Sequence, residues 1–163
     1  MTGSYSTFRI LCSSPPDSQR EQELFLSCLA RFCEQVTMPD WVLFAPATFR
    51  APFDANAART AVEANIRTCD FFLHVYGGTV PDAVYQGFVD SALRCTADPD
   101  FAMRSAVVFF RETGEVSTEM RALRESLASD ARCRVLAYHD ESDLETHFRG
   151  MLEDWYSQVR RVA

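Results

Sequence analysis

Two short polar segments, residues 12–17 and 76–82, contain residue types that could bind a nucleotide, and each follows an apolar run. Two adjacent glycines in the second segment would let the backbone approach a ligand closely. The helix expected after this segment would offer unpaired amides to an anion. Hydroxyl groups in both segments can hydrogen-bond a sugar or a phosphate. The candidate ligand-binding residues are Ser13, Ser14, Asp17, Tyr76, Gly77, Gly78 and Thr79.

A purely structural role would explain the same glycines, and the sequence leaves this alternative open. Gly77 and Gly78 could simply turn the chain at the end of a strand, and Asp82 could cap the helix that follows. Neither a Gly-x-Gly-x-x-Gly fingerprint nor a Walker A phosphate loop is present in the sequence. No phosphate-loop motif therefore decides between ligand binding and chain turning.

Several reaction types are excluded because the chain lacks the residues that they need. All 16 basic residues are arginine, so a Schiff-base lysine and a Walker lysine are both absent. A Gly-x-Ser-x-Gly nucleophile elbow is absent as well. No Cys-x-x-Cys pair occurs, and the histidines lie at no metal-ligand spacing from the cysteines, so no metal site is expected. His74 lies within an apolar run, which favours a packed core histidine over a catalytic base.

Length and composition indicate a single globular domain over residues 1–163, with 47% hydrophobic and 24% charged residues. The net charge of −7 and the lack of a basic stripe argue against a nucleic-acid partner. No apolar stretch approaches the ~20 residues of a membrane span, and residues 1–7 do not resemble a signal peptide. Four of the six cysteines, Cys12, Cys28, Cys33 and Cys133, occupy apolar positions typical of buried thiols. A reducing cytoplasm is the expected location.

Five apolar runs alternate with amphipathic segments, and these elements must position the candidate residues. The predicted strands are residues 8–12, 41–45, 71–76, 106–110 and 133–138, with helices between and after them. This alternation predicts an α/β fold, a three-layer doubly wound sandwich. Its five-stranded parallel sheet is expected in the flavodoxin-like order 2-1-3-4-5. In that order segments 12–17 and 76–82 meet beyond the carboxyl ends of strands one and three, where such folds bind ligands.

Four stretches of the chain resemble the bacterial TIR-like domains, in particular the branch found at the front of large NTPase and repeat-containing proteins (the DUF4062 type). The first combines a strand that ends in Ser13-Ser14 with a nearby Asp17. The second is an amphipathic helix that runs into Cys69-Asp70 and an apolar strand. The other two look like the fourth strand and the final helix of that family. In full, the four stretches are residues 10–17, 61–73, 106–112 and 143–155.

The resemblance implies a flavodoxin-like fold with a role in signalling or defence, through self-association or contacts with other protein domains. It also implies that NAD could be a substrate or ligand, with no resident cofactor. Active relatives cleave the glycosidic bond of NAD with a Glu on the third helix. Here residues 79–97 contain no Glu, and their only carboxylates before the following loop are Asp82 and Asp90. These two are the candidate catalytic residues, although Asp is one methylene shorter than Glu.

Three functions remain open from the sequence. The first is a TIR-like signalling module that binds a nucleotide in the crevice and acts through protein–protein assembly, with neither nucleic acid nor membrane as a partner. The second is an NAD nucleosidase that uses Asp82 or Asp90. The third is an enzyme similar to the nucleoside deoxyribosyltransferases, which have a related fold and a Glu near the same place; residues 80–82 and Gly87 echo that family.

Overall fold

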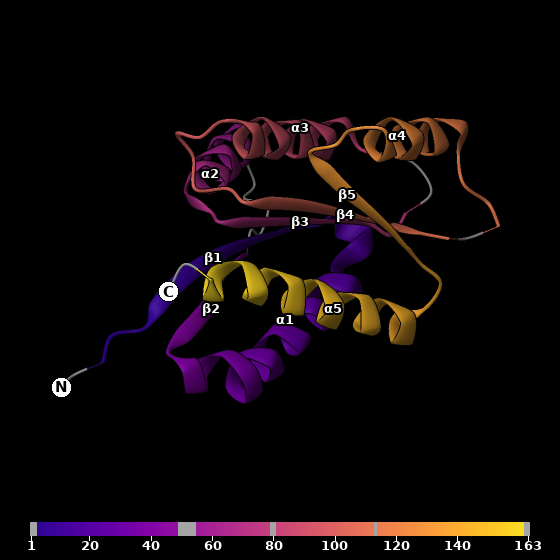
Figure 1. The fold of residues 1–163 in the computed structure, drawn as a ribbon. Coiled ribbons are helices and arrows are strands. Elements are labelled where there is room, and N and C mark those ends of the chain that lie inside the picture. Colours follow the sequence, from indigo (N-terminus) through magenta and orange to yellow (C-terminus); the bar gives the residue numbers. More distant parts are fainter. Residues whose placement is uncertain (1–2, 49–54, 79–80, 113, 162–163) are drawn as a thin grey trace.

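The computed structural model describes residues 3–48, 55–78, 81–112 and 114–161. In these ranges five parallel strands form one sheet in the order β2-β1-β3-β4-β5, which confirms the predicted α/β flavodoxin-like fold (Figure 1). The strands are β1 (Ser6–Ser13), β2 (Val42–Thr48), β3 (Phe71–Tyr76), β4 (Ser105–Arg111) and β5 (Cys133–Tyr138). The longer helices are α1 (Gln19–Phe32), α2 (Ala55–Thr68), α3 (Ala83–Ala97), α4 (Thr118–Ala128) and α5 (Glu141–Arg160).

Helices cover both faces of the sheet, with α1 and α5 on one side and α2, α3 and α4 on the other (Figure 1). All six residues of β3 are buried, as are the five central residues of β4. A strand covered on both faces is apolar at nearly every position, which explains the continuous apolar runs in the sequence; His74 of β3 is a buried polar exception. Aromatic side chains fill the α1/α5 side, where Trp155 stacks on Phe71 with ring centroids 4.6 Å apart.

The segment before β2 differs from the sequence prediction, which began the second strand at residue 41. Helix α1 continues into a π-helical turn over Cys33–Thr37 and a 3-10 turn over Met38–Asp40. Trp41 then takes a left-handed conformation with φ of 60°, and β2 begins at the next residue. Its side chain is 52% exposed and lies beside Tyr5, with ring centroids 5.2 Å apart. Trp41 therefore ends the helical turn and contributes to the surface, not to the sheet.

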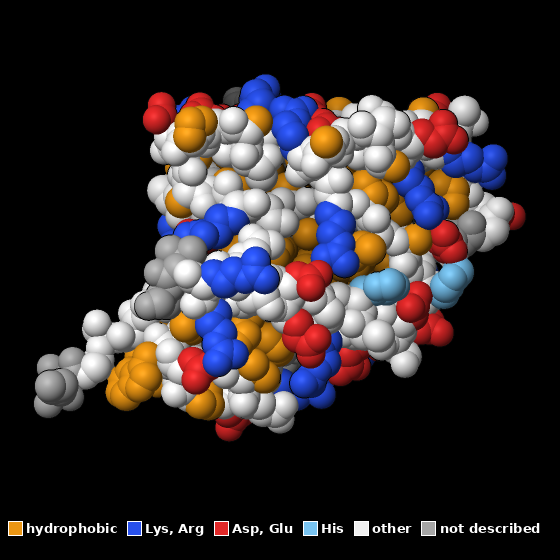
Figure 2. Space-filling view, viewed as in Figure 1, with side chains coloured by type: hydrophobic (Ala, Val, Ile, Leu, Met, Phe, Trp, Pro, Cys, Tyr) orange, Lys and Arg blue, Asp and Glu red, His pale blue; other side chains and the backbone are white. Residues whose placement is uncertain are grey.

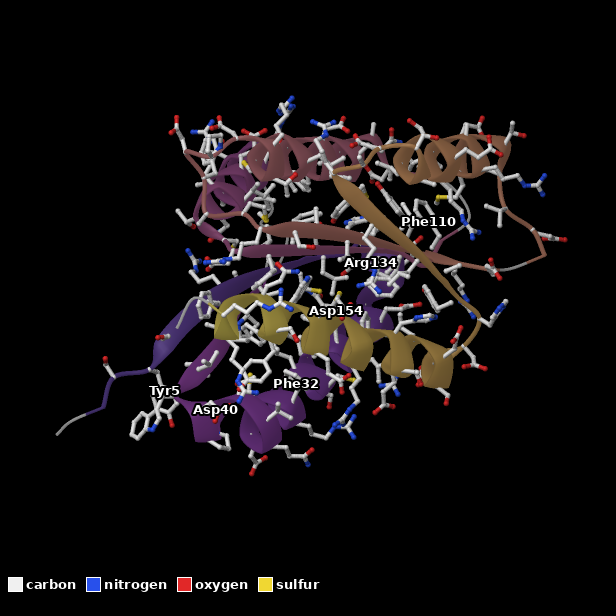
Figure 3. All side chains as sticks on the ribbon, in the orientation of Figure 1. Tyr5, Phe32, Asp40, Phe110, Arg134 and Asp154 are labelled. Atoms are coloured by element: carbon white, nitrogen blue, oxygen red, sulfur yellow. The ribbon has the colours of Figure 1, made fainter. Side chains whose placement is uncertain are left out.

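Strands β2 and β5 form the two edges of the sheet. Strand β2 contains Pro46, which supplies no backbone N–H. On β5, Arg134 bonds Asp154 of α5 at 2.6 Å, and Figure 3 shows the two side chains facing each other at this edge. Pro46 therefore interrupts the backbone donors of β2, and the β5 edge carries a charged side chain that is held by α5.

The surface and the thiols agree with a well-packed domain. Charged side chains of both signs are interspersed over the face drawn in Figure 2. The cysteines are all free, and every one except Cys133 is buried. Burial raises the pKa of Cys12, for example, to about 12. None of the described helices is both long and apolar enough to cross a bilayer. Within the described ranges no group of His, Cys, Asp and Glu side chains could hold a metal ion.

Candidate functional site

The carboxyl ends of β1 and β3 lie side by side, and the first polar pair at this junction is buried in the sheet. Ser13 is paired with His74 in the strand register, and Ser13 Oγ lies 3.0 Å from His74 Nδ1. Ser13 is 6% exposed and His74 is fully buried, so the Ser13 hydroxyl is turned towards the core. Burial lowers the pKa of His74 to about 3, which keeps the imidazole neutral at pH 7. The expectation of a packed core histidine is confirmed.

A hydrogen-bond relay joins the loop after β3 to the start of α1. The Gly77 amide donates to Ser18 Oγ at 2.9 Å, and the buried Ser18 hydroxyl donates to Asp17 Oδ1 at 3.3 Å. A short 3-10 turn over Pro16–Ser18 presents both side chains to the glycines. A Cβ added to Gly78 would overlap Asp17 Oδ2. The glycine is therefore needed for close approach, and the relay fixes the exposed Asp17 carboxylate beside it.

A second carboxylate packs against the same loop from α1. A Cβ added to Gly77 would lie 2.8 Å from Glu21 Oε1, which already accepts a hydrogen bond from the Tyr138 hydroxyl at 3.0 Å. Burial raises the pKa of the Tyr138 phenol, and the negative charge of Glu21 raises it further. Tyr138 therefore keeps its proton, and the bond fixes one oxygen of Glu21 between β5 and the loop after β3. No local sequence pattern predicts this bond, because its partners are 117 residues apart.

Asp82 and Asp17 approach Tyr85 from different elements. Asp82 is the N-cap of α3 and accepts a hydrogen bond from the Val84 amide at 2.9 Å, as the structural alternative expected. Burial raises the pKa of Tyr85, and the charges of Asp82 and then Asp17 raise it further. The half-buried Tyr85 ring also lies 5.7 Å from the His74 ring, measured between centroids. The charges of two carboxylates, one at the start of α3 and one in the turn before α1, therefore act on the same aromatic side chain.

The other candidate residues occupy different positions. Asp90 lies about two turns into α3, is exposed, and makes no hydrogen bond or ion pair within the described part of the chain. Ser14 is partly exposed beside the crevice. Thr79 lies outside the described residues. The structure therefore places Asp17, Gly77, Gly78 and Asp82 at the ends of β1 and β3. Asp90 is exposed further along α3. Burial raises the pKa of Tyr76, and the charge of Asp90 raises it further.

A pocket of about 340 Å³ adjoins the crevice between the ends of β3 and β4 and helix α4. Tyr76 and Gly78 line it on one side. Arg111, Arg121 and Arg124 also line it. These arginines were not among the candidate residues predicted from the sequence, because helical spacing does not show which side chains of α4 turn towards a neighbouring strand end.

Comparison with known proteins bears on the fold. No family model matches the chain, and no curated protein matches it. Among solved structures it is similar to the CMP N-glycosidase BcmB of Clostridium botulinum. That match has a TM-score of 0.52 and 14% identity, and it covers 85% of this chain and 96% of that one. A conserved protein of Enterococcus faecalis V583 also matches, with a TM-score of 0.49, 12% identity, and coverage of 90% of this chain and 99% of that one.

The BcmB match shows a shared α/β fold at this level of identity. Neither structure bears on the resemblance to TIR-like domains, which stays a prediction.

Proposed function

We propose that this protein cleaves the N-glycosidic bond of a nucleoside-type compound in the crevice between β1 and β3. The observation that carries this proposal is the placement of two carboxylates at the carboxyl ends of β1 and β3. Asp17 lies against Gly78 in the turn after β1, and Asp82 caps the helix that follows β3. They come from opposite sides of the crevice, and the Ser18 relay holds Asp17 in place. Other support comes from BcmB, a protein of similar fold that is named as a glycosidase acting on CMP.

The proposed chemistry follows from the charge that develops on the sugar. As the bond from C1′ to the base nitrogen breaks, its electron pair leaves with the base, and C1′ becomes oxocarbenium-like. Carboxylates placed beforehand stabilise that positive charge, and such preorganised groups are often the largest contribution to catalysis. The oxygen of a water molecule bonds to C1′, and Asp17 takes a proton from that water. A neutral nucleobase leaves as an anion and takes a proton from solvent, whereas the cationic nicotinamide of NAD leaves as a neutral molecule and needs none. Asp17 later returns its own proton to solvent.

This proposal includes the predicted cleavage of NAD. It shares with the predicted deoxyribosyltransferase-like enzyme only the glycosidic bond that is broken, because here water is the acceptor. It assigns the water-activating role to Asp17, which the sequence had suggested only as a ligand-binding residue. Asp82 contributes the second negative charge, with one oxygen engaged by the Val84 amide. Tyr85 contributes a flat apolar surface next to the base or the sugar. Asp90, exposed on α3, is expected to be dispensable.

Release of the free base, followed by chromatography, tests the proposal. Wild-type protein is incubated with NAD, cytidine, adenosine and their 5′-monophosphates, both dilute and concentrated with a crowding agent. Asp17→Asn should lower the rate by about 10²-fold, and Asp82→Asn should lower it too. Asp100→Asn is the matched control, because this exposed carboxylate lies in the loop before β4, at the other end of the strands. Full activity in Asp17→Asn, or no base release by folded wild-type protein in either state, would contradict the proposal.

A second candidate is the protein-assembly module implied by the TIR-like resemblance, and one surface feature favours it. Tyr5, Met38 and Trp41 are large apolar side chains that are 42%, 40% and 52% exposed. Figure 3 shows Tyr5 at the end of the molecule near Asp40, away from the crevice. Sedimentation velocity of wild-type protein and Trp41→Ser over a range of concentrations tests this candidate. Self-association that Trp41→Ser abolishes supports it, whereas a monomer at every concentration argues against self-assembly through this surface.

A further inference from the structure

We propose that the pocket beside α4 binds the 5′-phosphate of the substrate, so that the substrate is a nucleoside 5′-phosphate. The inference rests on the proposed function, because it names the compound whose glycosidic bond would lie in the crevice. The pocket is lined by Tyr76, Gly78, Arg111, Glu112, Arg121 and Arg124, together with apolar side chains. Its volume of about 340 Å³ lies within the range of small-ligand sites.

The charge of the pocket is opposite to that of the whole protein. Three arginines and one glutamate line it, in a chain whose net charge is −7. Arg124 bonds Glu112 at 3.0 Å, and the same carboxylate also lies 3.1 Å from His139 Nε2. Arg111 and Arg121 make no ion pair within the described ranges, so two guanidinium groups are available to an anion. Guanidinium groups suit phosphate because they can donate two parallel hydrogen bonds to its oxygens.

Tyr76 provides a second and independent indication of a ligand. Its side chain is 2% exposed and stacks on Phe110, with ring centroids 5.1 Å apart. Its hydroxyl has no hydrogen-bond partner among the described residues. Most buried polar groups are paired, so an orphaned hydroxyl on a residue that lines a pocket needs an explanation. A phosphate oxygen in the pocket would accept a hydrogen bond from this hydroxyl.

Gly78 connects the pocket to the crevice. It lines the pocket and also lies against the Asp17 carboxylate, with no room for a Cβ between them. In a nucleoside 5′-phosphate, the phosphate and the glycosidic carbon are at opposite ends of a single sugar. A phosphate held by Arg111 and Arg121 would therefore place the sugar over Gly78 and its C1′ towards Asp17. The start of α4 adds positive potential, because Val116 and Met120 on either side of it also line the pocket.

Calorimetric titration with ribose 5-phosphate, ribose and inorganic phosphate tests the pocket without requiring activity. Ribose 5-phosphate should bind wild-type protein at least about tenfold more tightly than either other probe. Arg111→Gln and Arg121→Gln should each weaken that binding by about tenfold. Arg94→Gln is the matched control, because Arg94 lies in the last turn of α3 and bonds Ser91 of the same helix. The control should bind like wild-type protein.

Three results would overturn the inference: ribose 5-phosphate does not bind, both arginine variants bind it normally, or inorganic phosphate binds equally well. The last would identify a site for free phosphate. The failures of the two proposals are distinguishable. Binding lost in the arginine variants, without base release from any substrate, supports the pocket and refutes the proposed function. Base release from nucleosides and their 5′-phosphates at the same kcat/KM supports the function and refutes the pocket.

Discussion

Replacing Gly78 with alanine tests whether Asp17 must stay where the Ser18 relay holds it. The added Cβ would overlap Asp17 Oδ2, so either the carboxylate or the backbone must move. No described glycine has a positive φ, which means that alanine suits the backbone at this position. Asp17 is exposed and can rotate into solvent. We therefore expect the carboxylate to move and the fold to persist.

The expected effects on stability and on activity differ in size. Rotation of Asp17 breaks its 3.3 Å bond with Ser18, which costs about 0.5–1.5 kcal/mol at most. Removing a glycine stabilises the protein by about 0.4–1 kcal/mol, because the unfolded chain loses conformational freedom. The two nearly cancel, and the free energy of unfolding should change by less than about 1 kcal/mol. Displacing a catalytic carboxylate by about 1 Å should lower the rate about 10²-fold.

The assay combines urea denaturation with base release, using Gly150→Ala as the matched control. An added Cβ at Gly150 meets nothing within 4 Å, and this glycine lies in the middle of α5. That substitution should stabilise the protein by about 0.5–1 kcal/mol and leave activity unchanged. Full activity in Gly78→Ala would refute the role of the Asp17 position. A loss of several kcal/mol of stability would show that the backbone, not the carboxylate, has moved.

Three further predictions follow from buried polar groups. Tyr76→Phe should raise the free energy of unfolding by up to about 1 kcal/mol, because it removes an unpaired hydroxyl. The same substitution should weaken the binding of ribose 5-phosphate. A lower stability of the variant in urea denaturation would contradict the first expectation. With a pKa of about 3, His74 stays unprotonated in the native state while the unfolded chain protonates it below about pH 6.5. Stability should therefore fall by about 2 kcal/mol from this group between pH 7 and pH 5, and His74→Gln, compared with exposed His139→Gln, should remove that fall in urea titrations. A thiol reagent should modify the native protein very slowly, and Cys133, the one partly exposed thiol, should react before Cys12. All 6 cysteines should react after unfolding, and rapid reaction of the native protein would contradict their burial.

The sequence could predict the sheet because both faces of its central strands are covered. Residues 71–76 read as one apolar run, and β3 occupies that same range with every residue buried. The predicted strand at 133–138 also has the bounds of β5. The error at residue 41 came from counting Trp41 as part of an apolar run, whereas a left-handed turn places it at the surface. Apolar character alone does not show where a helical turn ends.

The site was harder to predict, because its contacts join residues that are distant in the sequence. Spacing located the two glycines and Asp17, and the topology explains why they meet. The relay through Ser18 spans 59 residues, and no local pattern marks it. The arginines of α4 posed the same problem, since the pocket depends on how α4 lies over the end of β4. Fold-level rules therefore gave the location of the crevice, whereas the orientation of its groups came only from tertiary packing.

The two edges of the sheet have a consequence for how this molecule meets others. An open edge strand can template β-strand addition, and many proteins block such pairing with proline or charge. Pro46 removes one donor from β2, and on β5 the side chain of Arg134 is held by Asp154. A second chain could not continue an unbroken backbone ladder along β2. Any assembly at that end must therefore use side chains such as Trp41, which favours reversible, concentration-dependent association over fibrous aggregation.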